Sequence, residues 1–533
     1  MNGIRRIVVA FSLLTSMLFA LAGVLTPASA AAHGVAKEAY GGTIDINASP
    51  ATLDPGTTRT QPSSAPLFSL IYGQLYRDNP KGALSDDLAL AYDLSPDGLT
   101  VTIPLRHGVA FQDGTAFNAA AVAFNINRDE HGDSAGRCPC SPFLTDIKSV
   151  SARGKYTVVI HLIHRNLLLH DFLAESAATY IVSPTALQRE GEAQFGLAPV
   201  GAGPYRVTSF VPGTSGEVDK FAHSYEAKSV HVQAIKWQKI SSDAALIAGC
   251  QSQTVSVCTF GDTNLATDPA QIQSSVPSVL HEINSPRVNW TRLQFNVYSP
   301  PFNDQVARQA IQEATDPSKL LSFVAGNPSV TCGLIASGNE FYWGSSCPVG
   351  VPSYNPAGAA KLVASLPGGT LKFQAMSIDN SSIYSSILPA LVNMWNAIPG
   401  ITATPEIVPH STEVANQASG NFNMIAPGAG GGFIDPVLGA EPYIAAGSPQ
   451  NAYGYKSSKL DALLTRVETA KSTAQETKLW EDYNALDLSE EGDIGLYQGN
   501  NQNWVNNAIN GLSFSGFDVY YDRVWCTNGV CTH

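Results

Sequence analysis

Residues 289–321, NWTRLQFNVYSPPFNDQVARQAIQEATDPSKLL, show how the chain is organised. Apolar and polar residues alternate over residues 290–297, and this alternation predicts a β-strand. Two prolines end the strand, and Asn303 is placed to cap the helix that follows. Asp316 before Pro317 repeats the capping signal and predicts a second helix. The stretch therefore predicts a strand feeding two helices, at the point where the chain leaves one lobe and builds another.

Length, composition and charge limit the class of protein. At 533 residues the chain is longer than one hydrophobic core supports, so two or three lobes are expected. With 44% hydrophobic and 14% charged residues, the composition is that of a globular chain rather than a disordered one. The formal net charge is −13, whereas nucleic acid and anionic membranes select clustered Lys and Arg. We therefore expect no nucleic-acid partner.

The N-terminus has the pattern of an export signal. Arg5 and Arg6 precede an apolar run over residues 7–25, and an A-x-A cleavage site ends at Ala30. We interpret residues 1–30 as a cleaved signal peptide, with a retained membrane anchor as the alternative because the run only just spans a bilayer. Loss of the two arginines takes the formal net charge from −13 to −15. The mature protein is thus expected outside the cytoplasm.

The eight cysteines all follow residue 30, which predicts disulfides in an exported protein. Proximity in the sequence suggests three short loops, closed by Cys250 with Cys258, Cys332 with Cys347 and Cys526 with Cys531. Three interpretations stay open for Cys138 and Cys140: a strained local bridge, longer-range partners, or a metal pair.

Turn signals organise the first part of the mature chain. Residues 42–48 predict a first strand, and an L-D-P turn at 53–55 leads to a helix over residues 67–75. Two hairpins are predicted, one in residues 90–103 around a Pro-Asp-Gly turn and one in residues 147–162 around Arg-Gly.

Two further segments are the most distinctive. Residues 105–128 read LRHGVAFQDGTAFNAAAVAFNINR, where Asp113 begins a tight turn and Asn118 caps a helix. Residues 199–207 read PVGAGPYRV, and its two central glycines suggest backbone conformations that other residues cannot reach. A nucleotide-binding loop is not expected here, because no Lys-Ser/Thr follows.

The chain beyond residue 321 shows no internal repeat. The expected elements are a short helix at 361–366, a strand at 371–377, a helix at 383–397, helical spacing over 459–488 and a strand at 493–499.

These segments resemble the family 5 extracellular solute-binding proteins, the peptide- and nickel-binding components of ABC importers. The matching patterns are L-R-x-G-x-x-F-x-D-G-T before A-x-x-V-x-F-x-x-x-R in residues 105–128, P-V-G-T-G-P-Y at 199–205, the L-D-P turn and the crossover at 289–321. The chain departs from the helix pattern at Ala120 and Ala121, where family members usually carry two acids. The resemblance covers nearly all of the mature chain and is looser beyond Cys332.

The resemblance implies an α/β, periplasmic-binding-protein-like two-lobed fold with an additional subdomain in the first lobe (type II, cluster C-like). Lobe I would cover residues 31–290 with the subdomain at about 80–200, lobe II residues 291–494, and a C-terminal return residues 495–533. Hinges are expected near 294–299 and 496–501, where closure would enclose the ligand.

The function implied by the resemblance involves no covalent chemistry. A monomer would capture an oligopeptide or peptide-like solute and deliver it to an ABC permease with its ATPase. A sugar-like molecule or a nickel or other metal chelate is the alternative ligand, and a secreted hydrolase or structural surface protein is the alternative class. Lipoprotein relatives carry a cysteine just after the signal, and residues 20–40 contain none. The resemblance thus implies a free periplasmic or extracellular protein.

Motifs for catalysis or cofactors are absent from the sequence: there is no G-x-S-x-G, no H-E-x-x-H and no P-loop. We therefore expect no catalytic residues and no cofactor. His161, His164 and His170 lie within ten residues and raise the alternative of a metal site. The alternation of the hairpin places His161 away from the apolar face, so solvated histidines are the simpler interpretation and no metal is expected.

The glycine-rich segment 428–432 has two open interpretations, a flexible loop or a backbone that closely approaches ligand. In peptide-binding relatives this position resembles W-x-x-D-Y-P-D-P, whose first aspartate holds the peptide's amino group. Phe433 to Pro436 match the last four letters, so Ala429 and Gly432 stand where the tryptophan and that aspartate would be. Because a buried ammonium without a partner is costly, a peptide held by its N-terminus is disfavoured. The expected ligand-binding residues are Asn47, Leu53, Asn296, Gly430, Gly431, Gly432, Phe433 and Asp435.

Overall fold

The computed structural model describes residues 40–57, 65–78, 84–131, 144, 146–166, 169–175, 180–260, 265, 267–275, 278–285, 289–331, 333, 353–379, 382–431, 457–468, 470, 472–490, 493–515, 518–521, 523–527 and 531. All of them belong to one unit, Glu38–His533. The predicted signal peptide, Cys138, Cys140 and the Cys332–Cys347 pair lie outside the described residues. None of the described helices combines the length and apolar character needed to cross a membrane.

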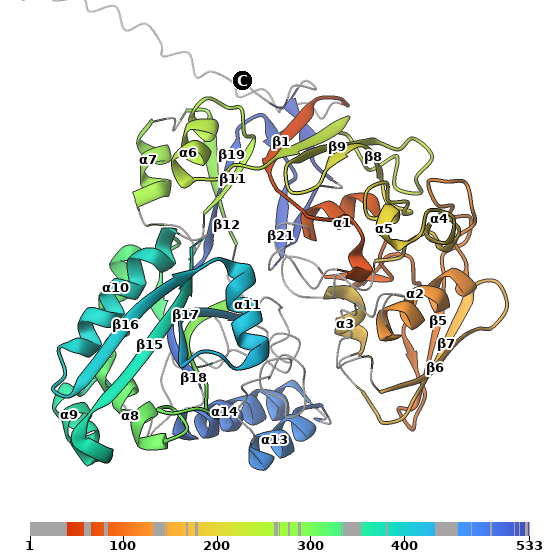
Figure 1. Ribbon diagram of the computed structural model, residues 1–533. Helices are drawn as coiled ribbons and strands as arrows, with labels where there is room; N and C mark the ends of the chain where they lie inside the picture. The colour runs from red at the N-terminus through yellow and green to blue at the C-terminus, as the bar shows by residue number, and fades with distance from the viewer. Residues whose placement is uncertain are drawn as a thin grey trace, which may run out of the picture. The chain divides into compact units, whose positions relative to one another are not determined.

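The first sheet is built around a parallel centre. Its strands, in spatial order, are β12 (Leu280–Ser285), β19 (Asn501–Asn506), β11 (Val257–Phe260), β1 (Thr43–Asn47), β10 (Ala234–Gln238), β9 (Ser215–Lys220) and β8 (Tyr205–Val211). β1 runs parallel to β10 and β11, and β19 is antiparallel to both β11 and β12. The helices α6 (Asp243–Gln251) and α7 (Thr267–Ser275) lie beside the β11–β19–β12 side of this sheet (Figure 1). The first strand expected at 42–48 is confirmed as β1.

The second sheet contains the crossover strand. Its order is β14 (Ser329–Val330), β18 (Asp493–Gln498), β13 (Asn289–Phe295), β17 (Met424–Gly431), β15 (Leu371–Ile378) and β16 (Ile401–Val408). One face packs on α8 (Gln305–Ala314) and α10 (Ser382–Asn396) through a buried cluster that includes Leu293, Phe295 and Trp395. Further elements of this half are η4 (Pro317–Phe323), α9 (Pro356–Ser365), η5 (Pro367–Gly369), α11 (His410–Ser419), α13 (Ser458–Glu468) and α14 (Thr473–Glu490).

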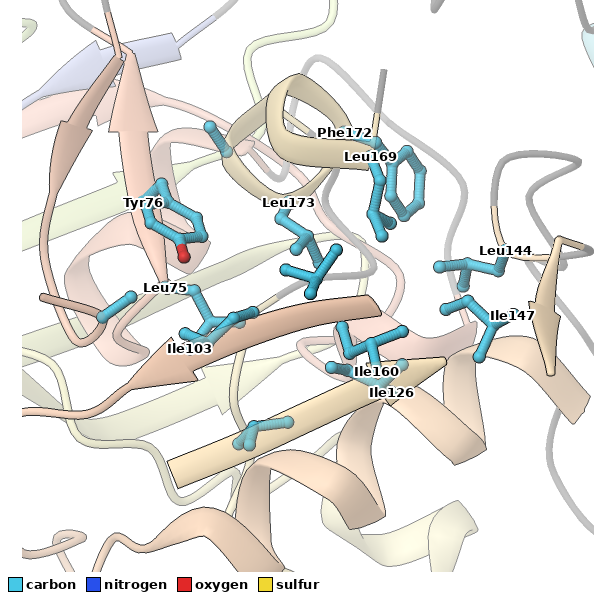
Figure 2. Close-up of a cluster of buried hydrophobic side chains, with 14 of the residues drawn as sticks. Leu75, Tyr76, Ile103, Ile126, Leu144, Ile147, Ile160, Leu169, Phe172 and Leu173 are labelled. Atoms are coloured by element: carbon cyan, nitrogen blue, oxygen red, sulfur yellow. The ribbon is translucent and has the colours of Figure 1, made fainter. Parts of the chain in front are cut away.

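A separate four-stranded sheet forms between residues 93 and 162. Its order is β4 (Asp93–Leu94), β5 (Thr100–Pro104), β7 (Thr157–Leu162) and β6 (Ile147–Ala152), so both predicted hairpins are present. It packs with α2 (Ala119–His131) and α3 (Leu169–Glu175) in one hydrophobic cluster. Figure 2 shows Leu173 of α3 above the strand that carries Ile103, and Ile126 of α2 beside Ile160 of β7.

The remaining elements are short. They are η1 (Pro55–Thr57), α1 (Ala65–Ile71), α4 (Pro184–Glu190), α5 (Glu192–Phe195) and the paired strands β2 (Tyr76–Asp78) with β3 (Leu84–Asp86), β20 (Ile509–Asn510) with β23 (Trp525–Cys526), and β21 (Ser513–Ser515) with β22 (Asp518–Tyr520). The disulfides expected for Cys250–Cys258 and Cys526–Cys531 are both present.

A buried ion pair holds the L-D-P turn against α2. The Arg128 guanidinium donates Nη1 to Asp54 Oδ1 at 3.0 Å and Nη2 to Oδ2 at 2.6 Å, and both side chains are buried. Asp54 Oδ1 also accepts the Gly56 backbone N–H at 3.1 Å. Burial raises the pKa of the neighbouring Asp129 well above its usual range, although Arg128 opposes this shift.

Three local expectations need correction. The helix expected over 67–75 ends at Ile71, because the Ile71 and Gly73 carbonyls accept the backbone N–H groups of Gly203 and Ile181 and so leave the helical ladder. The cap of α8 is Asp304, not Asn303: Asp304 Oδ1 accepts the Val306 N–H at 2.9 Å. The segment after Asp316 is a 3₁₀-helix, although Asp316 caps it as expected.

The glycines of PVGAGPY are required for space rather than for an unusual conformation. Neither Gly201 nor Gly203 has a positive φ. A Cβ at Gly201 would lie 2.2 Å from the Ile71 carbonyl oxygen, and one at Gly203 would lie 2.6 Å from the Ile71 carbonyl carbon. The expectation of a special backbone conformation is therefore wrong, and close contact with the end of α1 replaces it.

Candidate ligand site

The strand directions bring the two sheets together at one edge of each. In the first sheet, β1 and β11 end at this edge, which is also where β12 ends and β19 begins, because Ser285 pairs with Asn501. In the second sheet, the start of β13 pairs with the end of β17, Asn289 with Gly431. The chain leaves the first sheet after Ser285 and enters the second at Asn289, and it leaves the second after Gln498 and re-enters the first at Asn501.

These short links limit how far apart the two edges lie. At 3.8 Å between consecutive Cα atoms, the first link spans at most about 15 Å and the return at most about 11 Å. Ligands of α/β proteins bind beyond the carboxyl ends of strands. The first link lies upstream of residues 294–299, which belong to the second sheet or follow it. A hinge at 294–299 stays a prediction. The return at 499–500 falls within the expected range.

The glycine-rich segment forms part of this edge. Gly428 pairs with Arg292 and Gly430 with Trp290, in the antiparallel ladder of β17 with β13. Residues 428–431 are therefore strand, and the flexible-loop interpretation is wrong for them. Two of the largest side chains of β13, both buried, thus belong to residues whose cross-strand partners are glycines.

Trp290 faces away from the core formed by α8 and α10. Its side chain is 1% exposed and belongs to a buried cluster that includes Leu460 and Leu464 of α13 and Trp480 and Tyr483 of α14. Sequence reasoning assigned Trp290 only to a strand. The signal that marks it, a glycine directly across the ladder, depends on a pairing between segments about 140 residues apart, which the sequence does not display.

Hydrogen bonds hold the return link to the second half of the chain. The Asn500 N–H donates to the Gly326 carbonyl oxygen at 2.7 Å, and the Gly326 N–H donates to Gln502 Oε1 at 3.1 Å. Gln502 Nε2 in turn donates to Glu282 Oε1 at 2.7 Å. An isolated bridge also joins Leu265 to Val324. The return link is therefore held by the backbone N–H of Asn500 and by the side chain of Gln502.

Two predicted site residues belong to the first sheet and the turn after it. Asn47 is exposed at the end of β1, and its Oδ1 accepts the Ile240 N–H at 2.9 Å. Leu53 is fully buried, and its carbonyl oxygen accepts the Tyr72 hydroxyl at 2.6 Å. Asn47 thus lies at the crossing edge, whereas the Leu53 side chain packs in the core. Ligand contact by either residue stays a prediction.

The other predicted residues belong to the second half. Gly430 and Gly431 lie at the crossing edge, whereas Asn296 follows the far end of β13, six residues and about 20 Å from Trp290. The Asn296 amide is already used: Nδ2 donates to the Gly420 and Phe422 carbonyls at 2.9 and 3.0 Å, and Oδ1 accepts the Tyr298 N–H. The structure therefore does not bring Asn296 together with the two glycines. Gly432, Phe433 and Asp435 lie outside the described residues.

The three histidines do not converge. His161 and His164 are exposed, and His164 Nδ1 lies 3.4 Å from Asp146 Oδ1. His170 lies on α3 and stacks on Tyr92 with ring centroids 4.3 Å apart, and burial lowers its pKa. Among the described residues no group of three or more His, Cys, Asp or Glu is placed to hold a metal ion.

A cavity of about 260 Å³ lies over β1, β8, β9 and β10 of the first sheet. Its polar lining includes Asp45, Glu217 and Lys236, and Lys236 Nζ lies 3.4 Å from Glu217 Oε1. Burial raises the pKa of Asp45, with Lys236 opposing the shift. None of the predicted ligand-binding residues lines this cavity, so we do not assign the ligand to it.

Comparison with known proteins identifies similar chains. The sequence profile of the bacterial extracellular solute-binding proteins, family 5 Middle, matches residues 83–450. The chain is 28% identical over 317 residues to the glutathione-binding protein GsiB of Escherichia coli O1:K1 / APEC, a match that covers 59% of each protein. The chain thus matches less than two thirds of the length of this relative.

Solved structures share the fold at low sequence identity. The oligopeptide-binding protein AppA of Bacillus subtilis, in complex with a nonapeptide, has a TM-score of 0.79 at 18% identity, covering 92% of this chain and 100% of AppA. The ABC transporter-associated periplasmic binding protein DppA of Helicobacter pylori, in complex with the peptide STSA, has a TM-score of 0.80 at 17% identity, with 92% and 99% covered. The expected two-lobed α/β fold of periplasmic binding proteins is confirmed.

Proposed function

Because the chain belongs to family 5 of the bacterial extracellular solute-binding proteins, we propose that it is the extracytoplasmic solute-binding component of an ABC importer. It captures a peptide or peptide-like solute between its lobes and passes it to a membrane permease driven by an ATPase. Binding involves no covalent chemistry, since the family consists of solute-binding proteins.

The observation that carries this proposal is the meeting of the two sheets at their carboxyl-end edges. Along the chain, these edges are connected between Ser285 and Asn289 and again between Gln498 and Asn501. Two lobes joined by short links can open and close by small changes in a few backbone angles. Closure encloses a ligand and creates the surface that a permease recognises.

A peptide-like ligand is supported by two kinds of relative. A relative of 28% identity is named for binding glutathione, which is itself a modified tripeptide, and AppA and DppA were solved with peptides bound. Gly430 and Gly431 offer backbone without side chains next to Trp290, which suits a ligand of peptide dimensions. The position of Gly432 in the motif argues that the ligand is not held by a carboxylate on its amino terminus.

Location and assembly follow from the same proposal. Residues 1–30 act as a cleaved signal peptide, and the mature protein works as a monomer in the periplasm or outside the cell. The lobe boundaries expected at 290 and 494 move outward, because β13 begins at Asn289, β18 ends at Gln498 and both belong to the second sheet. Lobe I then covers residues 31–288 with the subdomain near 80–200, lobe II residues 289–498, and residues 499–533 return to lobe I. Asn47, Gly430 and Gly431 contact the ligand, together with Gly432, Phe433 and Asp435.

The test is native mass spectrometry of the protein purified from its own host, followed by thermal shift with peptides of two to eight residues and with glutathione. A ligand that binds only the folded state raises the melting temperature by mass action. A matched pair of free and N-acetylated tripeptides should raise it about equally, because glycine stands at position 432, where the relatives' aspartate holds the amino group. If a sugar or a nickel chelate raises the melting temperature and no peptide does, the peptide assignment is wrong. If no ligand binds, the importer assignment is wrong.

A further inference from the structure

Trp290 carries a hydrogen-bond donor that the described protein leaves unused. Its indole Nε1 is buried and has no acceptor among the described residues. A buried N–H without an acceptor is unfavourable, because the group has lost its water without replacing it. A native structure therefore calls for an explanation of such a group.

The unused donor alone does not single out Trp290. In the described part of the chain, Trp237, Trp480 and Trp504 also have a buried indole nitrogen without an acceptor. Trp504 lies in a different cluster with Cys258 and Phe260, on the side of the first sheet that α6 and α7 cover. Trp237 packs against Gly216 in the first sheet. Trp480 shares the buried cluster of Trp290 but lies on α14, whereas Trp290 lies on the strand that begins next to the link between the sheets.

Trp290 lies where the candidate ligand site is. It is the second residue of β13, next to the link between the sheets, and its cross-strand neighbour is Gly430. Neither Gly430 nor Gly431 has a side chain that would separate the indole from a molecule lying along this end of β17. Arg292, also buried, stands opposite Gly428 two residues further along. β13 itself, NWTRLQF, contains no acidic residue.

We propose that the indole N–H of Trp290 donates a hydrogen bond to an oxygen acceptor of the bound solute, a peptide carbonyl or a carboxylate, and thereby helps to select it. The inference rests on the proposed function. The relatives' aspartate accepts hydrogen bonds from the amino group of a peptide. Trp290 would instead donate a hydrogen bond to an oxygen of the ligand. Selection by such a donor does not require a free amino terminus.

The test uses isothermal titration calorimetry with three probes: reduced glutathione, Ala-Ala-Ala and Ala-Ala-Ala amide. Trp290→Phe keeps an aromatic ring and removes the N–H. Trp504→Phe is the matched control, because it removes an equally unused donor and the same ring volume away from the site. For probes that bind the wild type, Trp290→Phe should weaken binding about fivefold for a neutral carbonyl acceptor and about tenfold or more for a carboxylate. Trp504→Phe should stay within about twofold of wild type.

The probes separate the two acceptors, because only the amide probe lacks the terminal carboxylate of Ala-Ala-Ala. The ligand-free proteins provide a second readout: if the N–H is unused, Trp290→Phe should melt no lower than Trp504→Phe. Unchanged affinity in Trp290→Phe overturns the inference while leaving the proposed function intact. A ligand-free Trp290→Phe that melts well below the control also overturns it, since the N–H would then be bonded within the protein. If the wild type binds neither the probes nor a co-purified solute, the proposed function is wrong, and this inference is wrong as well.

Discussion

Replacing Gly326 by alanine should destabilise the protein by more than the cost of its positive φ, because the new methyl group would collide with the return link between the sheets. Gly326 has φ +80°, and a Cβ added there would lie 1.8 Å from the Asn500 carbonyl oxygen and 2.9 Å from its carbonyl carbon. Asn500 cannot simply turn away, because its own N–H donates to the Gly326 carbonyl at 2.7 Å. The substitution therefore forces residues 499–500, the link itself, to move.

The magnitude has two parts that a control can separate. A positive φ costs alanine about 1 kcal/mol relative to glycine. Crowding against main-chain atoms adds about 2 kcal/mol, within the range for overpacked sites, for a total of about 3 kcal/mol. Gly368 has a similar φ of +74° but no atom within 4 Å of an added Cβ, so Gly368→Ala should lose only the first part.

The assay is urea unfolding of the ligand-free proteins followed by circular dichroism, with the affinity for a bound peptide measured in parallel. Gly326→Ala should lose about 2 kcal/mol more than Gly368→Ala, the difference being the crowding contribution. It should also bind ligand more weakly, because the displaced link changes the closure of the lobes, whereas Gly368→Ala should bind normally. Equal losses in the two variants would refute the reasoning, since they would show that the Asn500 backbone yields freely.

Three further outcomes test the packing around the site. Asp54→Asn should destabilise the protein by about 3–5 kcal/mol in urea unfolding, because it takes the carboxylate from the buried Arg128 guanidinium; a loss below 1 kcal/mol would contradict this. Burial raises the pKa of Asp129, so its favourable contribution is complete below the unfolded value of about 3.9 and is lost as pH rises toward the folded pKa. The melting temperature of Asp129→Asn should accordingly fall less between pH 4 and pH 8 than that of the wild type, and parallel curves would count against a raised pKa. Replacing Cys250 and Cys258 together by serine should cost about 2.5 kcal/mol, the loop-entropy value for a sequence separation of 8, and unchanged stability would argue against the bridge.

Local signals in the sequence predicted local structure well. The Pro-Asp-Gly hairpin works because Gly98 adopts φ +74° and Ser95 pairs with Thr100, and Asn118 caps α2 by accepting the Ala121 N–H at 3.0 Å. These features depend on residues within a few positions of one another. Such features can therefore be predicted from the local sequence alone.

Features that depend on distant partners were missed or misread. α1 ends at Ile71 because backbone carbonyls at this point accept N–H groups from near residues 181 and 203, more than 100 positions away. Gly201 is needed for contact with that same segment, although its sequence context suggests an unusual turn. In both cases the sequence indicated which residues are structurally important. It did not show which distant segment they contact.

The candidate site shows the same limit more sharply. Asn296 directly follows β13 and Gly430 lies in β17, and the sequence does not show in which direction these two strands pair. The pairing of Asn289 with Gly431 and of Phe295 with Met424 fixes the direction and puts the two residues near opposite ends. Only the end with Gly430 adjoins the links to the first sheet, so a ligand held between the lobes meets the glycines and Trp290, while Asn296 uses its amide to hold residues 420–423. A single substitution separates the two roles: Asn296→Ala should lower stability through the lost backbone hydrogen bonds and leave the affinity for a bound peptide unchanged.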